Sequence, residues 1–220
     1  MIAKELLSEQ VHALRTTDSV ETAIDYLATQ GFSELPVLEN KSIYNYCRLQ
    51  TLYSYEDKSQ VLSEVVAANP HAPKAFEDQH LYELVPMLAA NELSVLGVVD
   101  VEGVYIGAID QKQINKLITQ SLTYRGMGAV LVLELDEKDY TPATIARWIE
   151  ENGAKVLGLM VSQLDMGRLK VNIKVNTTYV RTVTATLERQ GYRVSQIYLS
   201  EDSNDKNDHE IDLALRFFDL

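Results

Sequence analysis

The first half of this chain contains a repeat at a spacing of 61 residues, which narrows the folds that it can adopt. Apolar residues stand at i, i+3, i+4 and i+7 in two places, which is typical of one face of an amphipathic helix. These residues are Val20, Ala23, Ile24 and Leu27 in the first copy, and Leu81, Leu84, Val85 and Leu88 in the second. The same spacing links Leu35 to Leu96 and Val37 to Val98. We therefore expect one supersecondary unit that is built twice.

Each copy predicts the same order of elements: an extended lead-in, a helix, two strands joined by a tight turn, and a closing helix. Asp18 with Glu21 predicts a capping box at the first helix, and Asp78 predicts the corresponding start in the second copy. The strands are expected over residues 34–38, 42–46, 94–99 and 104–109. The two units are expected over residues 1–60 and 61–124.

A different pattern follows the glycines of residues 126–128. Strand-like segments (129–135, 155–163, 169–175 and 193–199) alternate with two helices, the first beginning at Thr141-Pro142 and the second ending at Gly191. The order β-α-β-β-α-β is that of the split βαβ, ferredoxin-like arrangement. Residues 211–217 could add a last strand. We predict an α/β (α+β) chain whose third domain spans residues 128–220.

Charge and composition exclude several classes of partner. The formal net charge is −12, which disfavours nucleic acid and anionic membranes, because both are bound through Lys and Arg. Cys47 is the single cysteine, so no intramolecular disulfide framework is possible. The first residues lead into no apolar run of signal-peptide length, and no stretch has the length of a membrane span. We expect a cytoplasmic protein.

No constellation for catalysis or metal binding stands out. Asp136, Glu137 and Asp139 are explained by a turn that enters a helix, where acidic residues suit the helix dipole. The acidic stretch that begins at Asp202 fails the calcium-loop template, which needs glycine at position six and glutamate at position twelve. Those positions hold Asn207 and Leu213. We therefore predict no enzyme, no metal site and no cofactor.

The duplicated half resembles a tandem pair of CBS domains, with Leu35-Pro36-Val37 on a central strand and Gly107-Ala108-Ile109-Asp110 ending the last strand. The second half resembles an ACT domain, and chains that combine the two occur among AcuB-type accessory proteins. The resemblance implies adenosine-containing ligands in the CBS clefts, amino acids or similar effectors at the ACT-like domain, and a homodimer. It predicts a regulatory protein.

The resemblance also indicates candidate ligand-binding residues. Those of the CBS cleft are Thr16, Leu35, Pro36, Val37, Arg48, Thr51, Ser94, Gly107, Asp110 and Gln113, and those of the ACT-like domain are Tyr140, Thr141 and Ala143.

The chain departs from the family pattern Gly-x-x-Thr-x-x-Asp, in which the aspartate binds ribose. Thr51 and Gln113 stand where that aspartate is expected, and Asp110 replaces the hydroxyl residue near the phosphate. Arg48 could attract a phosphate. Ala143 replaces a glycine that lets a ligand approach the backbone. The alternative is a structural or oligomerisation protein whose clefts are vestigial.

Overall fold

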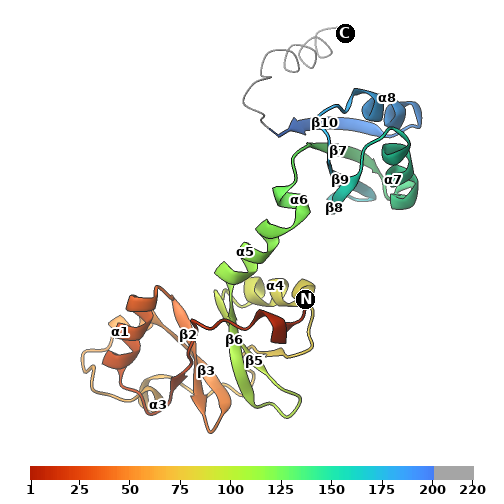
Figure 1. Ribbon diagram of the computed structural model, residues 1–220. Helices are drawn as coiled ribbons and strands as arrows, with labels where there is room; N and C mark the ends of the chain where they lie inside the picture. The colour runs from red at the N-terminus through yellow and green to blue at the C-terminus, as the bar shows by residue number, and fades with distance from the viewer. Residues whose placement is uncertain (201–220) are drawn as a thin grey trace. The chain divides into compact units, whose positions relative to one another are not determined.

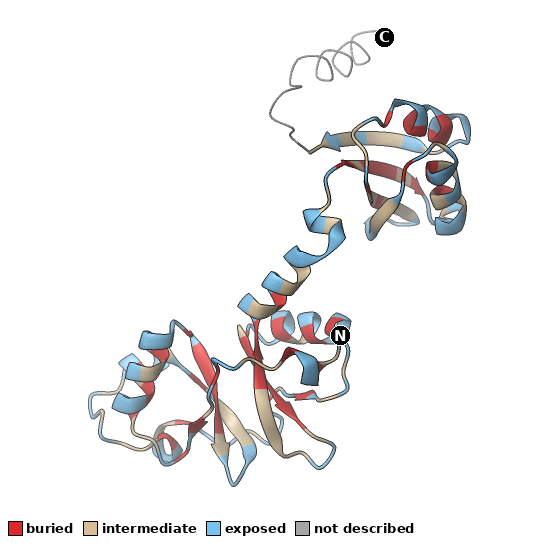
Figure 2. Ribbon diagram, in the orientation of Figure 1, coloured by how far each residue is buried: buried red, intermediate tan, exposed pale blue. Residues whose placement is uncertain are grey.

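The structure, a computed structural model, describes residues 1–200, and Figure 1 shows the course of the chain. The chain divides into two compact units, Met1–Ile118 and the part from Thr119 onward. Each unit contains buried apolar side chains of its own (Figure 2), so each is described by itself. The predicted α+β fold class is confirmed. The predicted strand over residues 211–217 and the acidic stretch from Asp202 lie outside the described residues.

The first unit contains two three-stranded sheets, in the orders β1-β2-β3 and β4-β5-β6. Its elements are η1 (Ala3–Leu6), β1 (Leu14–Arg15), α1 (Val20–Gln30), β2 (Glu34–Glu39), β3 (Ser42–Arg48), α2 (Leu49–Tyr53), α3 (Leu62–Val65), β4 (Ala75–Phe76), α4 (Leu81–Ala90), β5 (Val95–Val99), β6 (Tyr105–Asp110) and α5 (Gln111–Gln120).

The pairing of the strands repeats at the spacing found in the sequence. Leu14 pairs with Val37 in the first sheet, and Ala75 pairs with Val98 in the second, so both partners move by 61 positions. The hairpins β2–β3 and β5–β6 are antiparallel, and each shifts register directly after its Val37 or Val98 position. The duplication is therefore confirmed down to its irregularities.

The N-cap residue of α1 lies one position later than predicted. Ser19 is the N-cap residue, and its hydroxyl accepts a hydrogen bond from the Thr22 amide at 3.1 Å. The Asp18 carboxylate accepts instead from the Arg15 amide at 2.7 Å, within the preceding turn. The prediction of Asp18 as the cap was wrong, because Asp18 and Ser19 both carry short acceptor side chains that suit a cap.

The start of α4 also differs from the prediction. His80, rather than Asp78, is the N-cap residue, and its ring nitrogen accepts from the Tyr82 amide. Glu83 completes a capping box, since its carboxylate accepts a hydrogen bond from the His80 amide at 3.1 Å. Histidine is rarely an N-cap residue, so the residue pattern favoured Asp78 instead.

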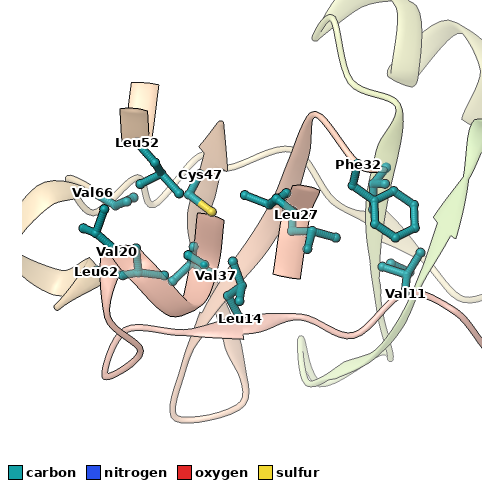
Figure 3. Close-up of a cluster of buried hydrophobic side chains, with 14 residues drawn as sticks. Val11, Leu14, Val20, Leu27, Phe32, Val37, Cys47, Leu52, Leu62 and Val66 are labelled. Carbon is teal, nitrogen blue, oxygen red and sulfur yellow. The ribbon is translucent and has the colours of Figure 1, made fainter. Parts of the chain in front are cut away.

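Each copy buries its own cluster of apolar side chains. In the first copy, α1 contributes Val20 and Leu27, which meet Val37 and Cys47 of the sheet and Leu52 of α2 (Figure 3). In the second copy, Leu84 and Leu88 of α4 meet Leu96, Ile109 and Ile114. Burying a large aliphatic side chain contributes roughly 1.5–3 kcal/mol, so these clusters hold the helices on their sheets.

The second unit has the strand order β10-β7-β9-β8, with antiparallel neighbours throughout. Its elements are α6 (Leu122–Arg125), β7 (Ala129–Asp136), η2 (Glu137–Asp139), α7 (Pro142–Glu151), β8 (Val156–Asp165), β9 (Arg168–Val175), α8 (Arg181–Arg189) and β10 (Arg193–Leu199). This is the predicted βαββαβ order, with the two βαβ halves interleaved as in the ferredoxin-like arrangement. Both helices bury apolar side chains against β7 and β9; they are Ile145, Ile149, Val183 and Leu187.

None of the helices within residues 1–200 is both long and apolar enough to cross a membrane. Within the same residues, no three His, Cys, Asp or Glu side chains are grouped so as to hold a metal ion.

Candidate functional site

The two copies of the first unit meet at equivalent positions. Ser33 and Ser94 lie 61 residues apart in the sequence, and their hydroxyl oxygens are 3.3 Å apart. This contact joins equivalent positions of the two copies. The starts of β2 and β5, which follow these serines, therefore lie at the junction of the copies.

Glu34 breaks the symmetry of this junction, because the equivalent residue of the second copy is Val95. The Glu34 residue is only 4% exposed. Its Oε1 atom accepts hydrogen bonds from the amide and the hydroxyl of Ser94, and from the Val95 amide at 3.2 Å. A buried carboxylate needs such donors to offset its lost hydration. Glu34 thus ties the first copy to the backbone of the second.

Two adjoining pockets open at this junction, and both are lined by Ser33, Glu34 and Glu92. The first, of about 390 Å³, is walled mainly by α4 and α5, with Val85, Leu88, Ala89, Leu93, Ser94, Gln111, Ile114, Asn115 and Ile118. The second, of about 550 Å³, is lined on its other side by Arg48, Leu49, Gln50 and Tyr53. Their sizes and mixed linings fit a small organic molecule. We call the two together the junction groove.

Arg48 brings a positive charge to the junction groove. Its Nη1 atom is 3.9 Å from the Glu92 carboxylate, and its Nη2 atom donates to the Asn91 carbonyl at 3.5 Å. The side chains of Arg48 and Glu92 are 49% and 83% exposed, so this long ion pair contributes little to stability. The guanidinium is therefore available to an anionic group on a ligand.

Of the predicted CBS-cleft residues, Arg48 and Ser94 line the junction groove. Two of those at the end of the second copy, Gly107 and Gln113, lie against the chain's own N-terminal segment. The Asp110 carboxylate accepts from the Gln113 amide at 2.7 Å, and the Gln113 side chain reaches the Leu7 carbonyl at 3.5 Å. A Cβ atom on Gly107 would lie 3.1 Å from the Leu7 side chain.

The corresponding positions of the first copy contact the segment between the copies. The Asn45 side chain, at the position equivalent to Gly107, donates to the Ala67 carbonyl at 2.8 Å. Thr51 is exposed on α2, whereas Thr16 is buried and bonds the Leu38 carbonyl through its amide. Three further predicted residues, Leu35, Pro36 and Val37, are buried on β2.

The candidate residues of the ACT-like domain lie together at the start of α7. Thr141 is the N-cap residue, but its side chain makes no capping hydrogen bond. Tyr140 packs partly against the core of the second unit, and Ala143 is exposed in the first turn. They share one helix end, which can receive a carboxylate.

Three titratable groups of the first unit are held in their neutral form. Burial raises the pKa of the Cys47 thiol to about 12 and that of Tyr105 to about 12. Burial also raises the pKa of Tyr46, whose hydroxyl accepts from the Gly97 amide and donates to the Pro73 carbonyl. A nucleophilic cysteine needs a lowered pKa and access to solvent. Cys47 has neither, so it suits packing rather than catalysis.

Sequence reasoning missed Ser33, Glu34 and Glu92. Glu34 carried one signal that could have been used: a charged residue stands in a strand whose other copy has valine at the same position. Glu92 lies in the turn between α4 and β5, and its φ is positive, at 52°.

Comparisons with known proteins concern the fold. No family model matches the chain, and no curated protein matches it. Protein MJ1004 from Methanocaldococcus jannaschii is 15% identical with a TM-score of 0.50; the match covers 55% of this chain and 60% of that one, under two thirds of its length. A CBS domain pair/ACT domain protein from Thermotoga maritima is 13% identical, with a TM-score of 0.49 and coverage of 55% and 98%. The protein CBSX2, solved in complex with AMP, is 17% identical, with a TM-score of 0.45 and coverage of 54% and 96%.

Proposed function

We propose that this protein is a non-catalytic regulatory protein of the CBS-domain type that senses a small ligand in its first unit. The junction groove is the observation that carries this proposal. It combines a buried carboxylate, serine hydroxyls, an exposed arginine and apolar helix faces, which is the mixture found in small-molecule sites. It lies between the two copies, so a bound ligand would stabilise one arrangement of them over another.

The ligand that this chemistry favours is an adenine nucleotide or a close relative. The guanidinium of Arg48 suits a phosphate, and the apolar faces of α4 and α5 suit a base. Glu92 competes for Arg48, since its carboxylate stands 3.9 Å from the guanidinium. A phosphate that binds the Arg48 guanidinium must therefore displace the Glu92 carboxylate. The ACT-like second unit and a homodimer would relay the signal in the cytoplasm.

A panel of AMP, ATP, S-adenosylmethionine, NAD, cyclic dinucleotides and amino acids, followed by thermal unfolding, tests the proposal. A ligand at 100 times its dissociation constant adds about 2.7 kcal/mol of stability. We expect Arg48→Ala to weaken binding of the active nucleotide and Glu92→Gln to strengthen it. Arg181→Ala, which removes an exposed arginine of the second unit, should have no effect. If no compound raises the unfolding temperature, the ligand-sensing function is wrong.

One observation favours the alternative of a structural or oligomerisation protein. Gln113 and Asn45 use their side chains to hold Leu7 and Ala67 of the same chain, at positions where the CBS resemblance places ligand contacts. In that case the chain would form a stable oligomer with no response to any member of the panel. Light scattering beside the unfolding measurements separates the two functions.

A further inference from the structure

The helices α7 and α8 pack on the same face of the sheet in the second unit, where they meet Leu131 and Ile173 in one buried cluster. Successive side chains of a strand point to opposite faces, so the alternate residues form the other face. The short helix α6 lies against one corner of it, since a Cβ atom on Gly158 would meet the Thr123 side chain. We call the remainder the open face; its centre holds Val130, Met160, Lys170, Asn172, Lys174 and Tyr198.

Two lysines of β9 give the open face its positive charge. Lys170 stands opposite Glu134 in the strand register, but the Glu134 carboxylate lies 3.5 Å from the guanidinium of Arg168. The Lys174 ammonium donates to the Ser200 hydroxyl at 3.1 Å, a contact that does not balance its charge. Neither lysine forms an ion pair with any other residue that the structure describes.

Large apolar side chains lie on the open face beside the lysines. Met160 and Tyr198 are 61% and 55% exposed. Exposed apolar side chains that gather within a polar surrounding mark a surface that binds another segment or molecule. An occupant that fits the open face should therefore combine negative charge with apolar side chains.

The charge of the chain is divided unevenly between its parts. From Thr119 to Ser200, the second unit has ten Lys and Arg against eight Asp and Glu, which gives a net charge of +2. Residues 201–220, which we call the C-terminal segment, have two Lys and Arg against seven Asp and Glu, which gives −5. Opposite net charges attract, so the C-terminal segment and the second unit are electrostatically complementary.

The C-terminal segment also starts at the right place. Ser200 precedes it, and the Ser200 hydroxyl receives the hydrogen bond from Lys174. Lys170 and Lys174 are four strand positions apart, which is about 13 Å. Five residues of chain can reach about 17 Å, so residues 201–205 are long enough to bring carboxylates from Ser200 to both lysines. Six of the seven acidic residues lie in 201–212, and seven of the last ten residues are apolar.

We propose that the C-terminal segment docks on the open face of its own second unit, with its acidic half on Lys170 and Lys174 and its apolar end over Met160 and Tyr198. Exposed charge pairs are individually weak. Because the segment is tethered at Ser200, its effective concentration at the face is of millimolar order, so weak contacts suffice. An acidic partner protein must displace the segment before it binds this face. The docking goes beyond the proposed function and needs no ligand in the junction groove.

Cross-linking with a carbodiimide tests the docking in the full chain, because this reagent joins a lysine directly to a carboxylate that it contacts. We expect mass spectrometry to find Lys170 and Lys174 joined to residues 201–212. A mixture of isotope-labelled and unlabelled protein should show that these links form within one copy. The internal control is Lys155, whose ammonium lies 3.3 Å from the Glu150 carboxylate. If the control link forms while the two lysines stay unlinked, join the first unit or join another copy, the proposal is wrong.

Limited proteolysis gives a second readout. Docking should slow cleavage by trypsin after Lys206, and Lys170→Gln combined with Lys174→Gln should speed it by up to roughly fivefold for each lysine removed. The matched control is Lys138→Gln, which removes a lysine of the same unit that is 77% exposed and should leave the rate unchanged. The fluorescence of Trp148 checks that each variant is folded. Equal rates in all three proteins would overturn the docking. A failure of ligand binding in the panel leaves both results unchanged, so the two proposals fail separately.

Discussion

The buried carboxylate of Glu34 gives the sharpest prediction for stability. Glu34→Ala leaves the Ser94 amide, the Ser94 hydroxyl and the Val95 amide without their acceptor. A hydrogen bond to a charged group contributes about 1.5–3 kcal/mol, but the three share one oxygen and are not additive. Removing the carboxylate also removes the cost of burying it. We expect a net loss of about 2–3 kcal/mol from the first unit.

The two units can be followed separately during unfolding in urea. Trp148 is the only tryptophan of the chain and lies on α7, so its fluorescence reports on the second unit. Far-ultraviolet circular dichroism reports on both. Glu34→Ala should lower the midpoint of the first-unit transition and leave the Trp148 transition in place. Multidomain chains often unfold in separate steps, which this comparison uses.

The matched control is Glu39→Ala, at the exposed end of the same strand β2. It removes the same charge from the chain without removing a buried acceptor, and surface changes of this kind usually stay within about 0.5 kcal/mol. A loss below about 1 kcal/mol for Glu34→Ala would refute the role given to Glu34. So would an equal loss for Glu39→Ala.

Two further predictions concern protonation and backbone geometry. The raised pKa values of Cys47 and Tyr105, both about 12, mean that the folded state keeps protons that the unfolded state releases above about pH 9–10. From about pH 9–10 up to pH 12, each of these two groups should therefore lower the free energy of unfolding of the first unit by about 1.4 kcal/mol per pH unit. Urea midpoints that stay constant over this range would contradict the prediction. In the second unit, Gly128→Ala places a Cβ atom against the Val175 carbonyl at a φ of +137°, and tryptophan fluorescence should show a loss of at least about 2 kcal/mol. Gly167→Ala meets no atom within 4 Å and should lose only about 1 kcal/mol, so equal losses would count against the steric argument.

Most of the secondary structure followed from periodicity. The stripes from Val20 and from Leu81 became α1 and α4, and the strands of both halves formed within a few residues of their expected ends. These signals are local, because a helix or strand shows its buried face in the spacing of its own apolar residues. The helix caps were less certain, since Asp18 and Ser19 are adjacent and both suit the role.

The candidate site was less predictable than the fold. The CBS resemblance indicated Arg48 and Ser94, which do line the junction groove, but it gave no weight to Glu34 or Glu92. The groove forms only where the two copies meet, and its residues come from segments about 60 positions apart. The spacing of residues within one segment does not predict which distant segments line the groove together.

The duplication, the ferredoxin-like order of the second half and the α+β class could all be predicted from the residues alone. The sequence repeat has a spacing of 61 residues, and the paired strand residues Leu14 and Ala75 of the two copies are separated by the same 61 positions. The burial of Glu34 at the junction is visible only in the tertiary structure. Burial and strand order depend on which distant segments pack together, and a single chain's periodicity contains no information on its partners in space.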